Sequence, residues 1–365
     1  MKSKKIAFYI GSLQKGGAER VFVNLAEFFY SQGYQVTIVT QYQYQNEYSH
    51  SEGIRRVLSD LTEEETGKNR LFNFFRRIKK LRSIWKQVSP DLVLSCNGKN
   101  NFMALATTVF LKTKAVVSVV GEPTLEYYTP VMRMLAKSLF ILADGVVLQT
   151  KDSAEFFPVS IRKKAVILKN SMNPAFMKER FTGTREKTIV SVGRLDANKN
   201  QSLLIRAFAK IATDYPAYRV ILYGEGEDRE KLEQEVRRLG MKDRILLPGV
   251  TTDVATAIQK ASVFVLTSFT EGMPNALIEA MALGLAVIST DCPCGGPKEL
   301  IQNRKNGILI PVNDVDALAE ALRYLFDHPY EADRMGQEAS KIQQELDPAV
   351  TNQAWMEYFE QIIQK

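Results

Sequence analysis

The chain has 365 residues, of which 45% are hydrophobic and 24% are charged, a balance that is typical of a globular protein and excludes a disordered one. Single hydrophobic cores stop growing at roughly 250–300 residues, so the length favours two domains. Residues 1–180 carry a net charge of +12 and residues 181–365 a net charge of −5, which indicates two domains with different partners.

The first residues and the cysteines bear on location. No run of about 18 apolar residues occurs, so we expect no membrane-spanning helix. Only the five apolar residues 6–10 follow the charged start, too few for the core of a signal peptide and suited to a buried strand. Cys96, Cys292 and Cys294 suggest no disulfide framework, so a reducing cytoplasm is the expected compartment.

The first half alternates short apolar runs with helical patterns, which predicts βαβ units and a parallel sheet. Strands are expected at residues 6–10, 35–40, 91–95, 115–120 and 145–149, and helices at 17–31, 99–110 and 130–142.

The second half repeats this scheme. Its strands are expected at 187–192, 218–223, 244–247, 263–267, 286–290 and 307–310, and its helices at 200–213, 227–239, 275–283, 315–326, 331–344 and 350–364. Asn170, Asn173, Pro174 and Gly183 break the pattern, which places the boundary near 169–183. We therefore predict an α/β protein of two doubly wound parallel-sheet domains, with a ligand bound in the cleft between them at the carboxyl ends of the strands.

The segment 191–200 could hold a diphosphate. Its strand ends at Gly193, and two cations, Arg194 and Lys199, then precede a helix. A fork-shaped donor, a point charge and the amides of a helix end together suit phosphate oxygens. The alternative is a solvated loop with ordinary surface cations.

The segment 271–279 could hold hydroxyl groups. A helix is predicted to begin near Pro274, so the unpaired amides around Gly272, Met273 and Asn275 would be available to oxygen atoms. Two carboxylates, Glu271 and Glu279, bracket this helix start and could accept hydrogen bonds from sugar and ribose hydroxyls. The alternative is that Glu271 caps the helix and Glu279 is solvated. Because Glu279 has apolar neighbours in sequence, we expect it to be buried with a partner.

Two glycine-rich turns follow strands. The segment 11–20 does not match G-x-G-x-x-G, and no acidic residue follows the second strand, so nicotinamide binding is not favoured. Gly16 and Gly17 are instead predicted to let a substrate approach the backbone. The turn at 224–229 has either a structural or a binding role.

The basic segment 68–88 combines cations with large apolar residues and contains no acidic residue. A basic amphipathic helix with aromatic residues suits an anionic membrane surface, and the alternative is a helix packed on the sheet with a solvated basic face. No nucleic-acid motif accompanies the charge, so nucleic-acid binding is not expected. The cations are Lys68, Arg70, Arg76, Arg77, Lys79, Lys80, Arg82 and Lys86.

Other polar residues predict little chemistry. Asp314 begins a helix and is expected to cap it. Cys292 and Cys294 have no neighbouring ligands for zinc, and neither His50 nor His328 is a strong catalytic candidate.

The combination of Gly16 and Gly17, Arg194 with Lys199, and Glu271 with Glu279 resembles the retaining glycosyltransferases of family 4, which have the GT-B fold of two Rossmann-like domains. The run 290–297 resembles a branch that acts in exopolysaccharide, capsule and lipid-linked oligosaccharide assembly, including amylovoran-type and N-acetylgalactosamine-transferring enzymes. The resemblance covers nearly the whole chain and is most specific in 187–312.

The resemblance implies a role for each domain. Residues 1–170, with a final helix at 350–365 that crosses back, would bind the acceptor, and residues 171–349 would bind the donor. No metal or other cofactor is implied. Many relatives place a histidine after the strand ending near Val120, and this chain has none there. Glu122 and Glu126 are the candidates on the acceptor side.

The resemblance also implies roles for single residues. Arg194 and Lys199 would neutralise the departing diphosphate, Glu279 would bind the ribose, and Glu271 would face the donor sugar. The backbone of 272–275 would surround that sugar. These roles extend to the remaining positions, which are Gly193 in the phosphate loop, Gly16 and Gly17 beneath the reacting centre, and Gly249 and Val250 at the base.

The expected function is the transfer of a hexose or N-acetylhexosamine from a UDP-sugar to an undecaprenyl-diphosphate-linked glycan, at the cytoplasmic face of the plasma membrane. One alternative is a UDP-sugar epimerase of the same fold, which the lack of plausible acid–base histidines disfavours. Another is an inactive nucleotide-sugar-binding scaffold, which the intact carboxylates and cations disfavour.

Overall fold

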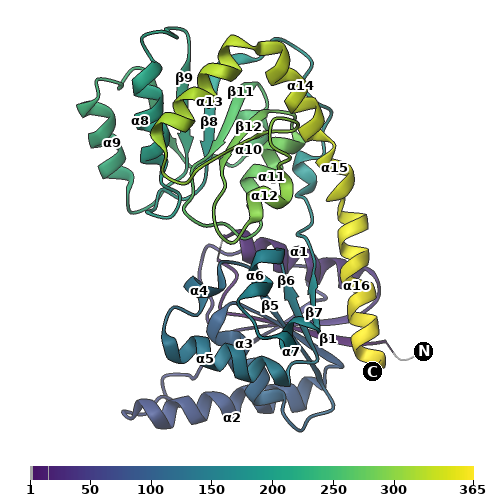
Figure 1. Ribbon diagram of the computed structural model, residues 1–365. Helices are drawn as coiled ribbons and strands as arrows, with labels where there is room; N and C mark the ends of the chain where they lie inside the picture. Colours follow the sequence, from purple (N-terminus) through teal and green to yellow (C-terminus); the bar gives the residue numbers. More distant parts are fainter. Residues whose placement is uncertain (1–2, 15) are drawn as a thin grey trace. The chain divides into compact units, whose positions relative to one another are not determined.

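The computed structural model describes residues 3–14 and 16–365, and the chain divides into two compact units (Figure 1). The N-terminal unit comprises Met1–Asn170 and Ala349–Lys365, and the C-terminal unit comprises Ser171–Pro348. Among the described residues, no helix is both long and apolar enough to cross a membrane.

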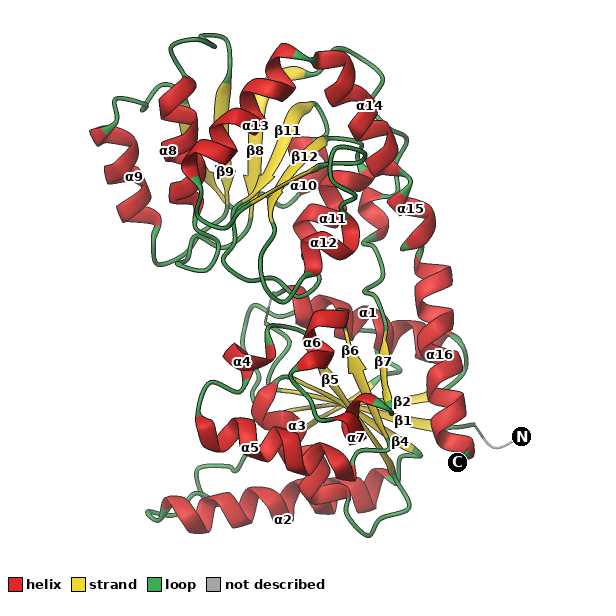
Figure 2. Ribbon diagram, viewed as in Figure 1, coloured by secondary structure: helices red, strands yellow, loops and turns green. Residues whose placement is uncertain are grey.

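The described part of the N-terminal unit contains a seven-stranded parallel sheet in the order β3-β2-β1-β4-β5-β6-β7 (Figure 2). Its strands are β1 (Lys5–Ile10), β2 (Gln35–Thr40), β3 (Arg55–Leu58), β4 (Leu92–Cys96), β5 (Lys114–Val119), β6 (Gly145–Leu148) and β7 (Ala165–Ile167). Its helices are α1 (Gly17–Ser31), α2 (Arg70–Val88), α3 (Gly98–Thr108), α4 (Pro123–Glu126), α5 (Pro130–Leu139), η1 (Phe140–Leu142), α6 (Lys151–Glu155), α7 (Val159–Arg162) and α16 (Pro348–Gln364).

The sequence did not predict the two edge strands of this sheet. Arg55 and Arg56 give β3 a charged start instead of an apolar run, which is common in strands that border solvent. The three residues of β7 are only partly buried, so they lack the continuous apolar signal of a central strand.

The described part of the C-terminal unit contains a six-stranded parallel sheet in the order β10-β9-β8-β11-β12-β13. Its strands are β8 (Glu186–Val192), β9 (Arg219–Tyr223), β10 (Ile245–Gly249), β11 (Ala261–Leu266), β12 (Ala286–Thr290) and β13 (Ile308–Ile310). Its helices are η2 (Pro174–Phe176), α8 (Gln201–Ile211), α9 (Arg229–Arg238), α10 (Val254–Ile258), α11 (Asn275–Ala282), α12 (Gly296–Leu300), α13 (Val315–Asp327), α14 (Pro329–Ser340) and α15 (Ile342–Glu345). The short helices α10 and α12 were not predicted.

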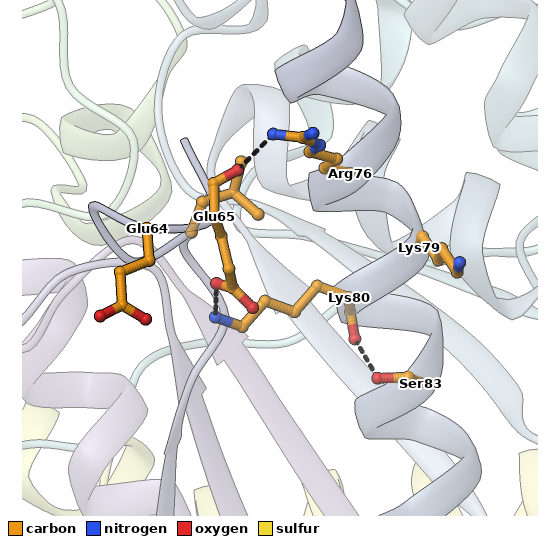
Figure 3. A pocket seen from close by; sticks show the side chains of 7 residues that line it. Glu64, Glu65, Arg76, Lys79, Lys80 and Ser83 are labelled. Atoms are coloured by element: carbon orange, nitrogen blue, oxygen red, sulfur yellow. Dashed lines mark hydrogen bonds and ion pairs between the residues drawn. The ribbon is translucent and has the colours of Figure 1, made fainter. Parts of the chain in front are cut away.

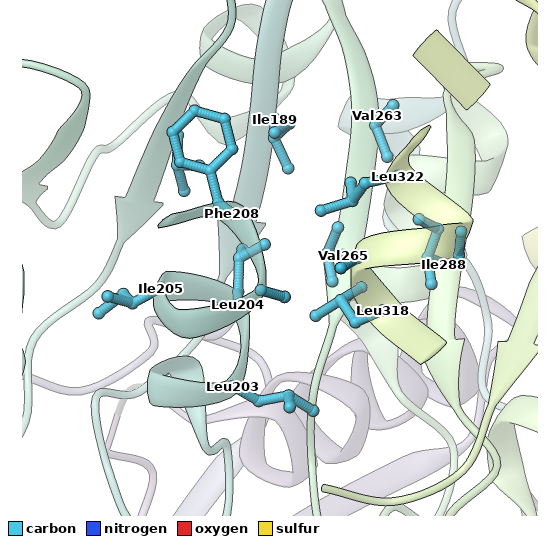
Figure 4. Close-up of a cluster of buried hydrophobic side chains, with 14 of the residues drawn as sticks. Ile189, Leu203, Leu204, Ile205, Phe208, Val263, Val265, Ile288, Leu318 and Leu322 are labelled. Atoms are coloured by element: carbon cyan, nitrogen blue, oxygen red, sulfur yellow. The ribbon is translucent and has the colours of Figure 1, made fainter. Parts of the chain in front are cut away.

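Successive residues of the central strands face opposite sides of the C-terminal sheet. Ile189 of β8 packs with α8 and α13 in one cluster (Figure 4), whereas its neighbour Val190 packs with α11 in a second cluster. Because helices cover both faces of the sheet, the side chains on both faces of these strands are apolar. The predicted fold class, two doubly wound parallel-sheet α/β domains, is confirmed.

Helix α16 completes the core of the N-terminal unit. Trp355, Phe359 and Ile362 are buried among residues of β1, β2, β4 and α1. The ring of Phe359 stacks on Phe29, with centroids 5.0 Å apart. The carboxylate of Glu360 accepts hydrogen bonds from Lys4 and Tyr34.

Candidate functional site

The site of the C-terminal unit lies at the carboxyl edge of its sheet. Strand β8 is hydrogen-bonded to β9 on one side and to β11 on the other. The loops that follow these parallel strands therefore meet at one edge, where ligands of open α/β sheets bind. These loops contain the predicted phosphate segment 191–200 and the predicted hydroxyl segment 271–279.

The loop after β8 presents its two cations differently. The side chain of Arg194 is 79% exposed, and its guanidinium lies 3.1 Å from the carboxylate of Asp196. The other oxygen of Asp196 accepts a hydrogen bond from the backbone amide of Lys199. Asp196 therefore fixes the turn between both cations, a role that the sequence did not reveal.

Asn198 ties this loop to the loop after β11. Its backbone oxygen accepts from the amide of Phe269 at 2.8 Å, and its side-chain amide donates to the carbonyl of Thr270 at 3.1 Å. The hydroxyl of Thr270 in turn donates to the Asn198 side-chain oxygen at 3.0 Å. Thr267 adds a hydrogen bond to the Lys199 carbonyl. These contacts fix Lys199 relative to the segment that begins at Glu271, and the only sequence signal for Asn198 is that it precedes Lys199.

Lys199 and Glu271 form an ion pair within this edge. The ammonium nitrogen lies 2.5 Å from Oε1 of Glu271, and the two side chains are 21% and 11% exposed. The same carboxylate oxygen accepts a hydrogen bond from Ser268 at 2.6 Å. A cation for phosphate and a carboxylate for hydroxyls therefore share one small volume.

The backbone of Glu271 is held by the loop that follows β12. Its amide donates to the carbonyl of Pro293 at 2.7 Å, and its carbonyl accepts from the amide of Gly296. A Cβ atom at Gly296 would lie 1.5 Å from the carbonyl oxygen of Gly272, so glycine is required there. The run that resembles a family signature, 290–297, thus positions the Glu271 loop.

The helix after this loop begins at Asn275, and its N-cap residue is Pro274, with no side-chain cap. The alternative in which Glu271 caps the helix is therefore wrong, because its carboxylate is engaged by Lys199 and Ser268 instead. Gly272, Met273 and Pro274 are buried and Asn275 is partly buried. Their availability to a sugar remains a prediction.

Glu279 is buried within α11, with 6% of its surface exposed. The alternative of a solvated helix residue is therefore wrong, and the burial expected from its apolar neighbours is found. A carboxylate that is kept inside a domain at this edge requires polar partners, because desolvating a lone charge is costly.

A pocket of about 240 Å³ opens beside Arg194. Gly224 borders it at φ +145, where a Cβ atom would lie 1.8 Å from the carbonyl oxygen of Gly193. Gly249, at φ +90, hydrogen-bonds the amide of Gly224 through its carbonyl. The turn at 224–229 is thus structural at its glycines and also borders a pocket. The lining includes Gly193, Arg194, Tyr223, Gly224, Val250 and Thr251.

The thiols of this unit are buried. Burial, together with the nearby Glu271 carboxylate, raises the pKa of the Cys292 thiol to about 12. Across residues 3–14 and 16–365, no group of three or more histidine, cysteine, aspartate or glutamate side chains could hold a metal ion. The predicted cap at Asp314 is confirmed, since its carboxylate accepts from the amide of Ala317 at 2.9 Å.

The N-terminal unit places its predicted residues at the carboxyl edge of its own sheet. Gly16 is the N-cap residue of α1 and Gly17 its first residue, so backbone amides of the helix start lie there. Glu122 caps α4 and accepts from the amide and hydroxyl of Thr124. Its predicted contact with the acceptor stays untested.

Glu126 is held inside the same edge. Its carboxylate accepts from the amide of Gly98 at 2.6 Å and from the hydroxyl of Tyr127 at 3.2 Å. Burial raises the pKa of Glu126 to about 7, although these hydrogen bonds oppose the rise. Glu126 therefore braces the turn between β4 and α3, whose residues Asn97 and Gly98 both have positive φ.

The basic segment 68–88 forms α2, whose two halves differ. Leu81, Ile84 and Trp85 of the second half are buried against the sheet. The first half exposes large apolar side chains, which are Leu71 (63%), Phe72 (66%), Phe74 (47%) and Phe75 (58%).

Several cations of α2 are engaged within the unit. Lys80 pairs with Glu65 at 2.6 Å beside a pocket of about 440 Å³, where Arg76 donates to the Glu65 carbonyl (Figure 3). Arg77 pairs with Asp60, and Arg82 donates to carbonyls at the end of α3. Within the described basic segment 68–88, the cations whose side chains have no recorded hydrogen bond or ion pair are Lys68, Arg70, Lys79 and Lys86.

The two units match two known protein families. The model "Glycosyltransferase Family 4" matches residues 15–158, and the model "Glycosyl transferases group 1" matches residues 173–342. A Campylobacter jejuni relative is named "GalNAc-alpha-(1->4)-GalNAc-alpha-(1->3)-diNAcBac-PP-undecaprenol alpha-1,4-N-acetyl-D-galactosaminyltransferase". It is 26% identical over 330 residues, which cover 88% of this chain and 89% of the relative.

Further relatives agree. The "Amylovoran biosynthesis glycosyltransferase AmsD" of Erwinia amylovora is 23% identical over 306 residues, covering 80% of this chain and 82% of the relative. The crystal structure of Anabaena HepE in complex with UDP and glucose superposes with a TM-score of 0.83 at 18% identity, covering 98% of this chain and 100% of that one. With both units matched and the fold shared, the chain belongs to the family 4 glycosyltransferases, enzymes of the GT-B fold.

Proposed function

We propose that this glycosyltransferase moves a hexose or N-acetylhexosamine from a UDP-sugar to an undecaprenyl-diphosphate-linked glycan in cell-surface polysaccharide biosynthesis. The observation that carries the proposal is the pairing of Lys199 with Glu271 at the carboxyl edge of the C-terminal sheet, beside Arg194 and the 240 Å³ pocket. A UDP complex of the similar HepE and the undecaprenol-linked substrate in the name of the C. jejuni relative support the choice of donor and acceptor.

The donor occupies the C-terminal unit in this proposal. The base enters the 240 Å³ pocket near Gly249 and Val250, Glu279 accepts hydrogen bonds from the ribose, and Glu271 faces the sugar. Arg194 and Lys199 stabilise the negative charge that develops on the departing diphosphate, as fixed cations do in a preorganised site. In this proposal no metal ion takes part, and the two cations alone stabilise the charge of the diphosphate.

The reaction proceeds with retention of anomeric configuration in this proposal. The acceptor hydroxyl attacks the anomeric carbon from the face that the diphosphate leaves, and the departing phosphate oxygen takes the hydroxyl proton. The new glycosidic bond forms as the bond to the diphosphate breaks, so no protein base is required. Lys199 and Arg194 then act mainly on turnover and Glu279 mainly on donor affinity.

The enzyme works at the cytoplasmic face of the plasma membrane as a peripheral protein in this proposal. The exposed apolar residues of the first half of α2 enter the interface, and Arg70 and Lys79 contact anionic headgroups. A lipid-linked acceptor would then be reached without extraction from the bilayer.

A panel of UDP-sugars tests the function, with UDP release measured in the presence and absence of an undecaprenyl-diphosphate-linked glycan. Acceptor-dependent release from one UDP-sugar is expected. Binding of UDP without release in any combination would instead favour the inactive scaffold, and conversion of the donor to its epimer would favour the epimerase. Glu279→Gln is expected to raise the donor KM at least tenfold with a smaller change in kcat.

A further inference from the structure

An uncharged aromatic loop follows β2 in the N-terminal unit. Residues 41–46 read Gln-Tyr-Gln-Tyr-Gln-Asn and carry no charge, although the first half of the chain is strongly basic. Tyr42 and Tyr44 are 46% and 47% exposed, and their ring centroids lie 6.3 Å apart. Two large rings are thus presented side by side to the solvent at the carboxyl edge of the sheet.

The polar residues beside these rings are also exposed to solvent. Gln43, Gln45 and Asn46 are exposed, and no hydrogen bond within the described residues is recorded for their side chains. Each carries a planar amide that can donate and accept hydrogen bonds at once.

The loop is held firmly at its start. The amides of Gln41 and Tyr42 both donate to the carbonyl of Gly11, at 3.0 and 2.9 Å. The guanidinium of Arg56 donates to the carbonyl of Tyr42 and to the hydroxyl of Thr40. The backbone of Tyr42 therefore cannot move independently of the glycine-rich loop.

The loop is also held at its far end, through Glu47. This carboxylate, 7% exposed, accepts from the amide of Leu13 at 3.1 Å and from Arg56 at 2.6 Å. Burial opposes ionisation of Glu47, but the hydrogen bonds from Arg56, Leu13 and Tyr44 prevail and lower its pKa. The amide of Tyr48 adds a hydrogen bond to the Leu13 carbonyl at 2.8 Å.

A preorganised loop that exposes rings and amides is suited to bind a ligand, because little conformational entropy remains to be lost on binding. Tyrosine offers a large rigid ring with a polar tip, and its electron-rich face attracts the C–H bonds of a pyranose. The side-chain amides beside the rings match sugar hydroxyls, since each can both donate and accept a hydrogen bond. The absence of charge disfavours a phosphate as the occupant.

We propose that the loop 41–48 is the subsite for the neutral sugars of the acceptor glycan. A pyranose stacks on Tyr42 or Tyr44 and is bound through the side-chain amides of Gln43, Gln45 and Asn46. That these sugars belong to the acceptor rests on the proposed function. That the loop binds neutral sugars does not depend on it. The loop is hydrogen-bonded at Gly11 and Leu13 to the glycine-rich segment 11–20, whose Gly16 and Gly17 the resemblance places beneath the reacting centre.

Saturation-transfer NMR with a panel of neutral di- and trisaccharides built from N-acetylgalactosamine, N-acetylglucosamine, galactose and glucose tests the subsite directly. The wild-type protein is expected to bind at least one of them. The double variant Tyr42→Ala/Tyr44→Ala is expected to weaken that binding at least tenfold, and Tyr42→Phe/Tyr44→Phe is expected to retain it because the rings remain. Tyr330→Ala, at a tyrosine of the C-terminal unit that is 90% exposed, is the matched control.

The outcomes separate this subsite from the proposed reaction. UDP binding, measured by calorimetry, should be unchanged in all three variants. If the wild type binds no oligosaccharide, or if Tyr42→Ala/Tyr44→Ala binds as the wild type does, the subsite is wrong even when UDP-sugar transfer is observed. If oligosaccharides bind through the two rings but no UDP-sugar is consumed with any acceptor, the subsite stands and the transfer reaction fails.

Discussion

Lys199 and Glu271 lie 72 positions apart in the sequence, yet their side chains meet at 2.5 Å at the edge of the C-terminal sheet. The meeting follows from strand order, because β8 and β11 are neighbours and each side chain follows its strand. Without a ligand, each charge neutralises the other. A bound diphosphate would compete with Glu271 for the ammonium of Lys199 and would leave the carboxylate free to accept from a sugar hydroxyl.

Removing one partner of this pair should destabilise the protein more than removing both. Lys199→Met leaves a carboxylate that is only 11% exposed without its cation, and we expect a loss of about 1–3 kcal/mol in unfolding free energy. The double variant Lys199→Met/Glu271→Gln should recover part of that loss. Urea denaturation of the wild type, Lys199→Met, Glu271→Gln and the double variant measures the coupling, and strictly additive losses would contradict it.

Arg194→Ala should separate catalysis from stability. Since this side chain is 79% exposed, its removal should change the unfolding free energy by no more than about 0.5 kcal/mol. Turnover with a UDP-sugar should fall by about 100-fold or more, because one fixed cation for the departing diphosphate is lost. Arg237→Ala, at an exposed arginine on α9, is the matched control and should turn over normally. Unchanged turnover of Arg194→Ala would remove Arg194 from the proposed mechanism.

Asn198 should act as a positioning residue for Lys199 and Glu271. Asn198→Ala removes two side-chain hydrogen bonds to Thr270, so kcat/KM for the donor should fall at least tenfold although both charged residues remain. Asn198→Asp keeps the acceptor for the Thr270 hydroxyl and should fall less. In a cycle with Thr270→Val, a coupling of about 1 kcal/mol in unfolding free energy is expected. No coupling would show that the two residues act independently.

Glu126 should make the protein less stable as the pH rises. Its pKa is raised by burial from 4.5 to about 7, so the folded state holds its proton more tightly than the unfolded state does. The loss of unfolding free energy that comes from ionising Glu126 is absent below about pH 4.5, grows between pH 4.5 and pH 7, and is complete above pH 7. Glu126→Gln keeps an acceptor for Gly98 but cannot ionise. Relative to the wild type it should therefore gain about 3 kcal/mol in unfolding free energy between pH 4.5 and pH 8. A pH-independent difference between the two proteins would contradict this.

The first half of α2 should carry binding to anionic membranes. Replacing Leu71, Phe72, Phe74 and Phe75 with serine should release the protein from vesicles of phosphatidylglycerol and phosphatidylethanolamine in a sedimentation assay, because these exposed residues contribute no core packing. Arg70→Glu/Lys79→Glu should weaken binding in a salt-dependent way.

The choice of cations matters for this test. Arg77 and Lys80 pair with Asp60 and Glu65, so reversing their charge would disturb the unit itself and confound the assay. Arg237→Glu/Lys242→Glu, at two exposed cations in the described part of the C-terminal unit with no recorded ion pair, makes the same change in net charge and is the control. Full retention of the serine variant on vesicles would exclude α2 as the anchor.

Much of this fold could be predicted from the sequence because its central strands are continuous apolar runs. β2 and β12 were predicted to the residue, whereas the edge strands β3 and β7 were missed, since a strand with one neighbour needs no such run. The long helices with one buried face were equally clear, whereas the five-residue helices α10 and α12 are too short to show a helical period.

The candidate site was predictable in its parts but not in its contacts. Arg194, Lys199, Glu271 and Glu279 stand out as charged residues beside strand ends and apolar neighbours. The hydrophobic pattern of a strand does not reveal which strands are its neighbours in the sheet. The ion pair of Lys199 with Glu271, which depends on the neighbouring strands β8 and β11, therefore could not be predicted. The hydrogen bonds between Asn198 and Thr270 could not be predicted for the same reason, because Thr270 follows a different strand.

The return of α16 to the N-terminal unit has a consequence for biosynthesis. The C-terminal unit is one continuous stretch, Ser171–Pro348, whereas the N-terminal unit needs Ala349–Lys365 to bury Phe29 against Phe359. On a translating ribosome, the second unit therefore has all of its chain before the first one does. The N-terminal unit keeps an uncovered hydrophobic face until residues 349–365 emerge from the ribosome. A ribosome stalled before these residues would therefore hold an incompletely folded chain that is prone to aggregate.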